Sequence, residues 1–248
     1  MRRTLINKTA QDLPLNVANV AIWILGMFAQ PFTFLATNVW SMWYRNAAAS
    51  TVLLICWYYY QSTTVHTDEL TSASRSRGTQ SQTARHSPFI DWPMWAKISS
   101  AIACGFVLLV ASHIGYGVVS MIFPNISDAV GALYARVNTQ PGLPGVLLLL
   151  PIAVVAEELF WRQVVLDKLL RVSSVRDGSF KTKQAMPILI SAALYAVTVA
   201  SSGSIILVIA ALCLGVFWGV QKMMTGTLLV PVITHLIWNA GLFFVWPV

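Results

Sequence analysis

The stretch GVLLLLPIAVVAEELFWRQVV, residues Gly145–Val165, decides the fold class. Its first dozen residues are apolar, and about 20 such residues in a helix cross the ~30 Å hydrocarbon core of a membrane. Two carboxylates, Glu157 and Glu158, follow this run, and Arg162 comes one turn later. Because ionisable side chains are costly inside a membrane, such a cluster indicates either a functional site or an ion pair near the membrane surface.

The rest of the chain has the same apolar character. Of its 248 residues, 56% are hydrophobic and 10% are charged, whereas a soluble domain has about 25% charged residues. So few charges cannot cover a soluble globule of this size, and they also exclude an intrinsically disordered chain. We therefore predict an all-α, polytopic helical membrane protein. About seven spans are expected, with six and eight as alternatives, at residues 17–37, 40–60, 98–123, 143–162, 185–202, 203–221 and 226–247.

The distribution of positive charge predicts the orientation. With the N-terminus inside, fourteen of the sixteen Lys and Arg residues fall on the inner side, and only Arg45 and Arg136 fall outside. Cytoplasmic loops carry such an excess, so we expect an N-in, C-out topology. The membrane also explains the net charge of +7, and we expect no nucleic-acid partner. The small size and simple topology favour a bacterial inner membrane.

A polar segment divides the chain. Residues 61–97 include TSASRSRGTQSQTARHS and have little apolar content up to Ser87, which is typical of a cytoplasmic loop. We expect an N-terminal segment with two spans at 1–60, this loop at 61–97, and a membrane-embedded core at 98–248.

The charged cluster has a spacing with chemical meaning. Glu158 and Arg162 are four residues apart and can pair on one helical face. Glu157 is rotated by about 100° and points in a neighbouring direction. An arginine can orient one carboxylate while the other acts as a general base toward water. The alternative is that Arg162 begins a cytoplasmic loop and the two glutamates reach toward the interface.

A second polar pair lies in LLVPVITHLIWNAGLFF, residues 228–244. His235 and Asn239 are also four residues apart and share a face. Together they offer hydrogen-bond donors to a developing oxyanion, although such a pair equally well joins neighbouring helices. His113, in FVLLVASHIGYGVV, is a weaker candidate, because a structural histidine is the more common outcome.

These residues resemble a family. Glu157-Glu158-Leu-Phe-Trp-Arg162 is similar to the EExxxR motif of the type II CAAX prenyl endopeptidase and bacteriocin-processing family, and His235-Leu-Ile-Trp-Asn239 is similar to its HxxxN motif. The resemblance covers roughly residues 143–247. It implies a helical intramembrane protease in which Glu157 activates water, Arg162 positions the glutamate pair, and His235 and Asn239 stabilise the oxyanion.

The sequence departs from this family at one position. Between the two motifs the family has FxxxH, whose histidine helps the glutamate to hold its water. The matching stretch here is ILISAALYAVTVASSG, residues 188–203. Tyr195 stands in for the aromatic residue, but Val199 replaces the histidine, and Thr198 is one position out of register.

The leading hypothesis is a glutamate-type intramembrane endopeptidase. It would act near the terminus or membrane anchor of a membrane-associated protein or peptide, with the lipid bilayer as its other partner. The residues do not indicate whether the substrate is prenylated. No cofactor is predicted; a divalent metal is left open, with no ligand pattern to support it. The alternative is a catalytically inactive relative that binds a membrane partner, and a proton-coupled transporter is a third, weaker reading.

Overall fold

The computed structural model describes residues 17–34, 42–75, 89–137, 143–174 and 180–247, and within these ranges the chain forms helices joined by short turns, with no strand. The prediction of an all-α protein is confirmed. In chain order the elements are α1 (Val17–Phe34), α2 (Met42–Arg75), α3 (Met94–Ile122), α4 (Ile126–Val137), α5 (Leu143–Glu158), the π-helical η1 (Leu159–Val165), α6 (Leu166–Ser174), α7 (Phe180–Val199), the 3₁₀ turn η2 (Ala200–Ser202), α8 (Ile205–Thr225), α9 (Leu229–Ala240) and the π-helical η3 (Gly241–Val245).

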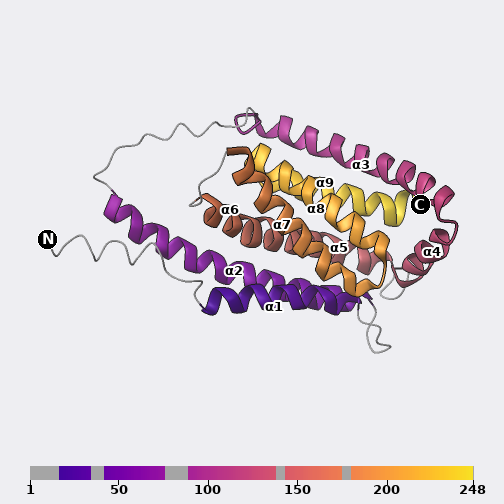
Figure 1. Ribbon diagram of the computed structural model, residues 1–248, viewed down its shortest axis with the longest axis horizontal. Helices are drawn as coiled ribbons and strands as arrows, with labels where there is room; N and C mark the ends of the chain where they lie inside the picture. Colours follow the sequence, from indigo (N-terminus) through magenta and orange to yellow (C-terminus); the bar gives the residue numbers. More distant parts are fainter. Residues whose placement is uncertain (1–16, 35–41, 76–88, 138–142, 175–179, 248) are drawn as a thin grey trace.

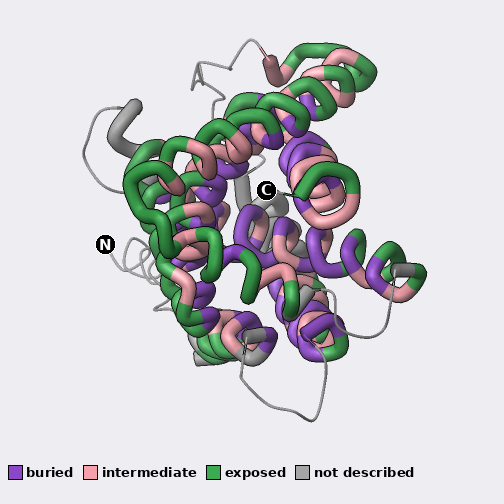
Figure 2. Tube along the Cα trace, turned by 90° about the vertical axis from the view of Figure 1, so that its right-hand side faces the viewer, coloured by how far each residue is buried: buried purple, intermediate pink, exposed green. Residues whose placement is uncertain are grey.

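The long helices form a bundle with the C-terminal helices at its centre. Helices α1 and α2 lie along one side of it and α3 along the other, with α5, α7, α8 and α9 between them (Figure 1). Helix α1 packs on α2 and α7, α2 packs on α5, and α3 packs on α9. Along the chain trace, buried positions lie mainly toward the interior of the bundle and exposed positions toward the outside (Figure 2).

In the part of the chain that the structure describes, four helical segments are long and apolar enough to cross a membrane. They are Met94–Ile122, Pro144–Val172, Gln184–Ser202 and Ile205–Thr225, while the apolar segment Leu229–Val245 is shorter. Four of the predicted spans therefore correspond to such segments. Helix α3 exposes large apolar side chains, such as Met121 at 85%, as expected of a helix that faces lipid.

The structure is helical in two places where the sequence predicts a loop or a connection. Helix α2 continues to Arg75, into the stretch expected to be a polar loop. No glycine or proline interrupts residues 61–75, so nothing in the sequence ends the helix there. Helix α4 occupies the expected connection between two spans, and Asp128 lies in its first turn, where a carboxylate interacts favourably with the helix dipole. The domain boundaries themselves stay a prediction.

The π-helical segment η1 joins α5 to α6 at the charged motif. A π turn disturbs the regular backbone hydrogen bonds and is frequent at functional sites. Two side chains from neighbouring helices bond its carbonyls: Ser191 Oγ donates to the Trp161 carbonyl at 3.2 Å, and Lys222 Nζ donates to the carbonyl of Arg162. Lys222 also pairs with Asp167. These contacts hold the motif against α7 and α8.

Glycines allow α3 to approach the C-terminal helix closely. A Cβ atom at Gly105 would lie 2.8 Å from the side chain of Ile237, and one at Gly241 would lie 2.6 Å from that of Leu109. Small residues at such contacts let membrane helices pack tightly. This packing fixes α9, which carries the second polar motif.

Candidate active site

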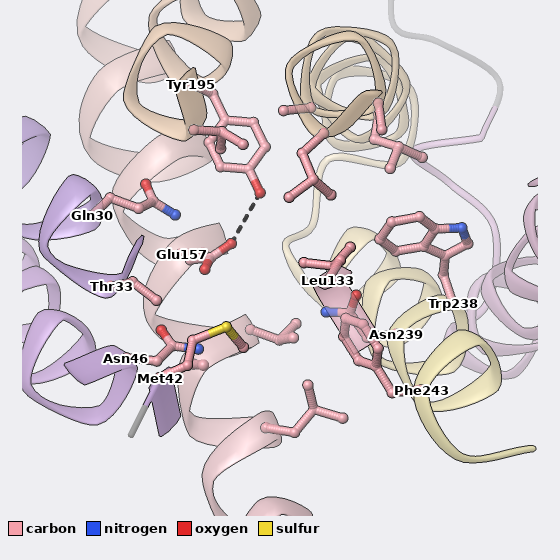
Figure 3. A pocket seen from close by; sticks show the side chains of 18 of the residues that line it. Gln30, Thr33, Met42, Asn46, Leu133, Glu157, Tyr195, Trp238, Asn239 and Phe243 are labelled. Carbon is pink, nitrogen blue, oxygen red and sulfur yellow. Dashed lines mark hydrogen bonds between the residues drawn. The ribbon is translucent and has the colours of Figure 1, made fainter. Parts of the chain in front are cut away.

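A cavity of about 140 Å³ lies between the N-terminal helices α1 and α2 and the C-terminal helices (Figure 3). It can hold several water molecules, since about 10–15 Å³ of such space accommodates one. Of the described residues that line it, Glu157 is the only carboxylate. Helices α7, α8 and α9 supply much of the cavity wall, and their part of it is largely apolar.

Glu157 extends from the last turn of α5 into this cavity. The Tyr195 hydroxyl on α7 donates a hydrogen bond of 3.1 Å to Glu157 Oε2, and Figure 3 shows the two side chains meeting at the cavity. A bond to a carboxylate is stronger than one between neutral groups and fixes its orientation. Glu157 is therefore held in place by one partner while facing open space.

Glu158 lies in a different environment. Its side chain is fully buried, and its two oxygens face different partners: Oε2 lies 3.1 Å from Arg162 Nε, and Oε1 lies 2.9 Å from His235 Nδ1. The predicted pairing of Glu158 with Arg162 is thus confirmed. Because a carboxylate paired with a guanidinium accepts hydrogen bonds, we assign the proton of that bond to His235 Nδ1.

Aromatic rings enclose this buried network. The Arg162 guanidinium lies 5.5 Å from the ring centroid of Tyr195 and 5.3 Å from that of Trp218, within the range of a cation–π interaction. The His235 ring stacks on Trp218 with centroids 3.8 Å apart. The imidazole is therefore fixed both by a hydrogen bond and by stacking.

The structure separates the two members of the second motif. Asn239 lines the cavity, and Figure 3 places it across from Glu157. His235 is not among the lining residues; it lies one turn earlier, buried against Glu158 and Trp218. Although His235 and Asn239 share one face of α9, His235 lies in the buried network and Asn239 lies at the cavity.

Val199 occupies the position at which the resemblance expects a histidine. It is buried and lines the cavity. Thr198 does not replace the missing group, because its hydroxyl donates to the Tyr195 carbonyl at 2.7 Å. The polar contact to Glu157 comes from Tyr195 instead. The sequence does contain a signal for this contact, because it has a tyrosine where the family motif has a phenylalanine. The prediction treated Tyr195 only as an aromatic ring and did not consider its hydroxyl.

The N-terminal helices also contribute to the cavity, which the sequence did not predict. Gln30 and Thr33 of α1 and Asn46 of α2 line it. The available signal was Gln30, beside Pro31, in a nearly continuous apolar run that Arg45 interrupts, and we gave it no role in a site. The packing of α1 and α2 onto the core could not be derived from that pattern.

His113 lies away from this constellation. Its Nδ1 bonds the Leu109 carbonyl at 2.8 Å, and its ring stacks on Trp246 with centroids 3.8 Å apart. The neighbouring Ser112 accepts a hydrogen bond from Trp238 Nε1, so α3 contacts α9 there, whereas a Cβ atom added at Gly115 would meet no neighbouring atom within 4 Å. His113 is not among the residues that line the cavity.

The arrangement contains the groups that hydrolysis of a peptide bond requires. A carboxylate faces a cavity, a carboxamide stands opposite, and a buried ion network supports both. Within the described residues, no group of three or more His, Cys, Asp or Glu side chains is placed to hold a metal ion.

The family comparison agrees with these motifs. Residues 139–241 match the family model described as type II CAAX prenyl endopeptidase Rce1-like, a range that contains all five predicted site residues. The resemblance is thereby confirmed over this segment. Comparison with curated proteins and with solved structures gives no match. Together with the four apolar helices, the family match identifies an integral membrane protein.

Proposed function

We propose that this chain is a glutamate-type intramembrane endopeptidase. The observation that carries the proposal is Glu157, a carboxylate that faces a cavity with Asn239 on the opposite wall. The substrate is a peptide bond near the terminus or membrane anchor of a membrane-associated protein or peptide. A site enclosed by apolar walls suits such a substrate and strengthens each electrostatic contact by excluding bulk water.

In the proposed reaction, Glu157 accepts a proton from water while the water oxygen attacks the carbonyl carbon of the substrate. The resulting oxyanion receives a hydrogen bond from the Asn239 amide and, in the doubly protonated form of the imidazole, a second one from His235 Nε2, since Nδ1 donates to Glu158. The C–N bond then breaks, and Glu157 returns the proton to the leaving nitrogen. His235 reaches the substrate when the site tightens around it, as catalytic hydrogen bonds are often long in the empty enzyme.

Tyr195 replaces the missing histidine in one respect, because it gives Glu157 a hydrogen-bond partner. Its hydroxyl donates to Glu157 Oε2, so the carboxylate stays oriented while it accepts the proton of the water. We therefore propose that Val199 is compatible with catalysis. The ring of Tyr195 also packs against Arg162, so this residue contacts both Glu157 and the buried ion network.

We further propose the N-in topology with about seven spans in a bacterial inner membrane. In this arrangement Asn125, in the turn before α4, lies outside, and Arg171 of α6 lies inside. In a variant without native cysteines, Asn125→Cys would react with an impermeant thiol reagent in intact cells and Arg171→Cys would not. The reverse pattern would overturn the orientation.

The test of activity compares protein termini in cells that express wild type or Glu157→Gln at equal levels. A terminus that forms only with wild type establishes proteolysis and identifies the substrate. Asp128→Asn is the matched control, because it neutralises an exposed carboxylate on α4 and is expected to leave that terminus in place. Formation of the same terminus in Glu157→Gln cells would refute the mechanism.

The alternative function is an inactive relative that binds a membrane partner, and Val199 in the cavity wall is the observation that favours it. That function requires no proton acceptor. It predicts identical termini in both strains, and co-purification of one membrane protein with wild type and Glu157→Gln alike.

A further inference from the structure

Two polar side chains of α1 line the cavity without a role in the hydrolytic scheme. Gln30 and Thr33 are each only 4% exposed and lie one turn apart. Figure 3 shows them on the wall formed by α1, with Asn239 and Trp238 on the opposite wall. Since α1 lies outside the segment that matches the family model, the motifs give no account of these residues.

The hydrogen bonds of Gln30 show which end of its amide is available. Its Oε1 accepts from Trp161 Nε1 at 2.7 Å. An indole nitrogen only donates, so the atom bonded to it is the oxygen, and this resolves the orientation of the amide. The Thr198 hydroxyl lies 3.5 Å from the same oxygen. Gln30 thus has its acceptor occupied and its NH₂ group directed toward the cavity (Figure 3).

Thr33 has a buried hydroxyl with no hydrogen-bond partner. A polar atom left in this state is costly, so such atoms in folded proteins call for an explanation. The backbone beside it is fixed, because Arg45 Nε donates to the Thr33 carbonyl at 3.1 Å. Thr33 therefore lines the cavity one helical turn from Gln30, with its buried hydroxyl donor unused.

We propose that Gln30 and Thr33 form a subsite for a main-chain carbonyl of an extended peptide substrate. Two neighbouring donors match the two lone pairs of one peptide oxygen. The apolar residues that line the same cavity, among them Leu207, Leu214 and Trp218, receive the apolar side chains of the same segment. The enzyme then recognises the substrate through its backbone and its apolar character rather than through a particular charged residue. This inference rests on the proposed endopeptidase function.

The first test measures cleavage by the full chain in liposomes. The probe is one 20-residue apolar peptide, chosen as cleaved by wild type from a synthetic pool. Thr33→Val preserves volume and removes the hydroxyl, and it is expected to raise KM about two- to tenfold with little change in kcat. Thr33→Ser restores the hydroxyl and should restore KM. Ser50→Ala is the control, because Ser50 also has a buried, unpartnered hydroxyl but does not line the cavity.

Peptides with one amide replaced by an ester locate the contact, because the ester carbonyl is a weaker acceptor. At one position the ester should raise the KM of wild type but add nothing to that of Thr33→Val, which is the signature of a shared interaction. An unchanged KM in Thr33→Val, or ester effects that add to it at every position, would overturn the subsite. The KM of Gln30→Leu is interpreted together with the melting temperature of this variant, because the substitution also removes the hydrogen-bond partner of Trp161.

Binding separates this inference from the proposed function. A fluorescent form of the same peptide, or of a non-cleaved member of the pool, is titrated onto Glu157→Gln and Glu157→Gln/Thr33→Val in liposomes. Weaker binding by the double variant supports the subsite whether or not wild type cleaves. Equal binding refutes the subsite while leaving the role of Glu157 to the cleavage assay.

Discussion

Glu158 is fully buried between a guanidinium and an imidazole, whereas the adjacent Glu157 faces a cavity and is bonded by a tyrosine hydroxyl. The first carboxylate has both oxygens beside cationic or donor groups, as a buried charge requires. The second has space in front of it for water and substrate. The two adjacent glutamates thus have different roles. Glu158, with Arg162 and His235, forms the buried half of the site, which maintains its geometry. Glu157, with Asn239 and Tyr195, forms the cavity half, which faces the substrate.

The largest expected effect is on stability, in the buried half. Arg162→Ala leaves the Glu158 carboxylate buried without its guanidinium, and breaking such a pair costs about 3–5 kcal/mol. Thermal unfolding in detergent should show a strongly lowered melting temperature. Lys168→Ala, on the partly exposed surface of α6, should change stability by less than about 0.5 kcal/mol. Equal melting temperatures for the two variants would contradict a structural role for the network.

In the cavity half, activity should respond while the fold does not. Asn239→Ala removes the proposed oxyanion donor that lines the cavity, and loss of one such donor lowers kcat by about 10²–10³-fold. The melting temperature should stay close to that of wild type. If Asn239→Ala unfolds early but cleaves normally when folded, the division between the halves is wrong.

Tyr195→Phe should have a smaller effect. The ring and its packing on Arg162 remain, while Glu157 loses the hydrogen bond that orients it. The loss of a bond to a charged group corresponds to a decrease in kcat of about ten- to hundredfold. Tyr195→Phe/Val199→His rebuilds the phenylalanine and histidine of the family motif and should recover part of that loss. A double variant no more active than Tyr195→Phe would argue against equivalence of the two arrangements.

Local patterns in the sequence predicted the helical fold and much of the site. Apolar runs gave four of the membrane-crossing helices, and the i,i+4 spacing gave the Glu158–Arg162 pair. Spacing alone could not predict that His235 turns to Glu158 while Asn239 reaches the cavity, because that depends on where Trp218 packs. Nor could it place Gln30 and Thr33, since their position depends on how α1 and α2 dock against distant segments. Helix α4 was missed because its residues lie between two predicted spans, in a stretch expected to be no more than their connection.

The most direct measurement compares Glu157→Gln and Glu158→Gln as purified proteins in liposomes, with cleavage of one apolar peptide and thermal unfolding recorded for each. We expect Glu157→Gln to unfold like wild type and to cleave at least about 10²-fold more slowly, because it has lost the general base. Glu158→Gln should unfold at a clearly lower temperature, because it disrupts the ion network. Cleavage by Glu157→Gln at the wild-type rate would contradict the central claim, whatever the behaviour of Glu158→Gln.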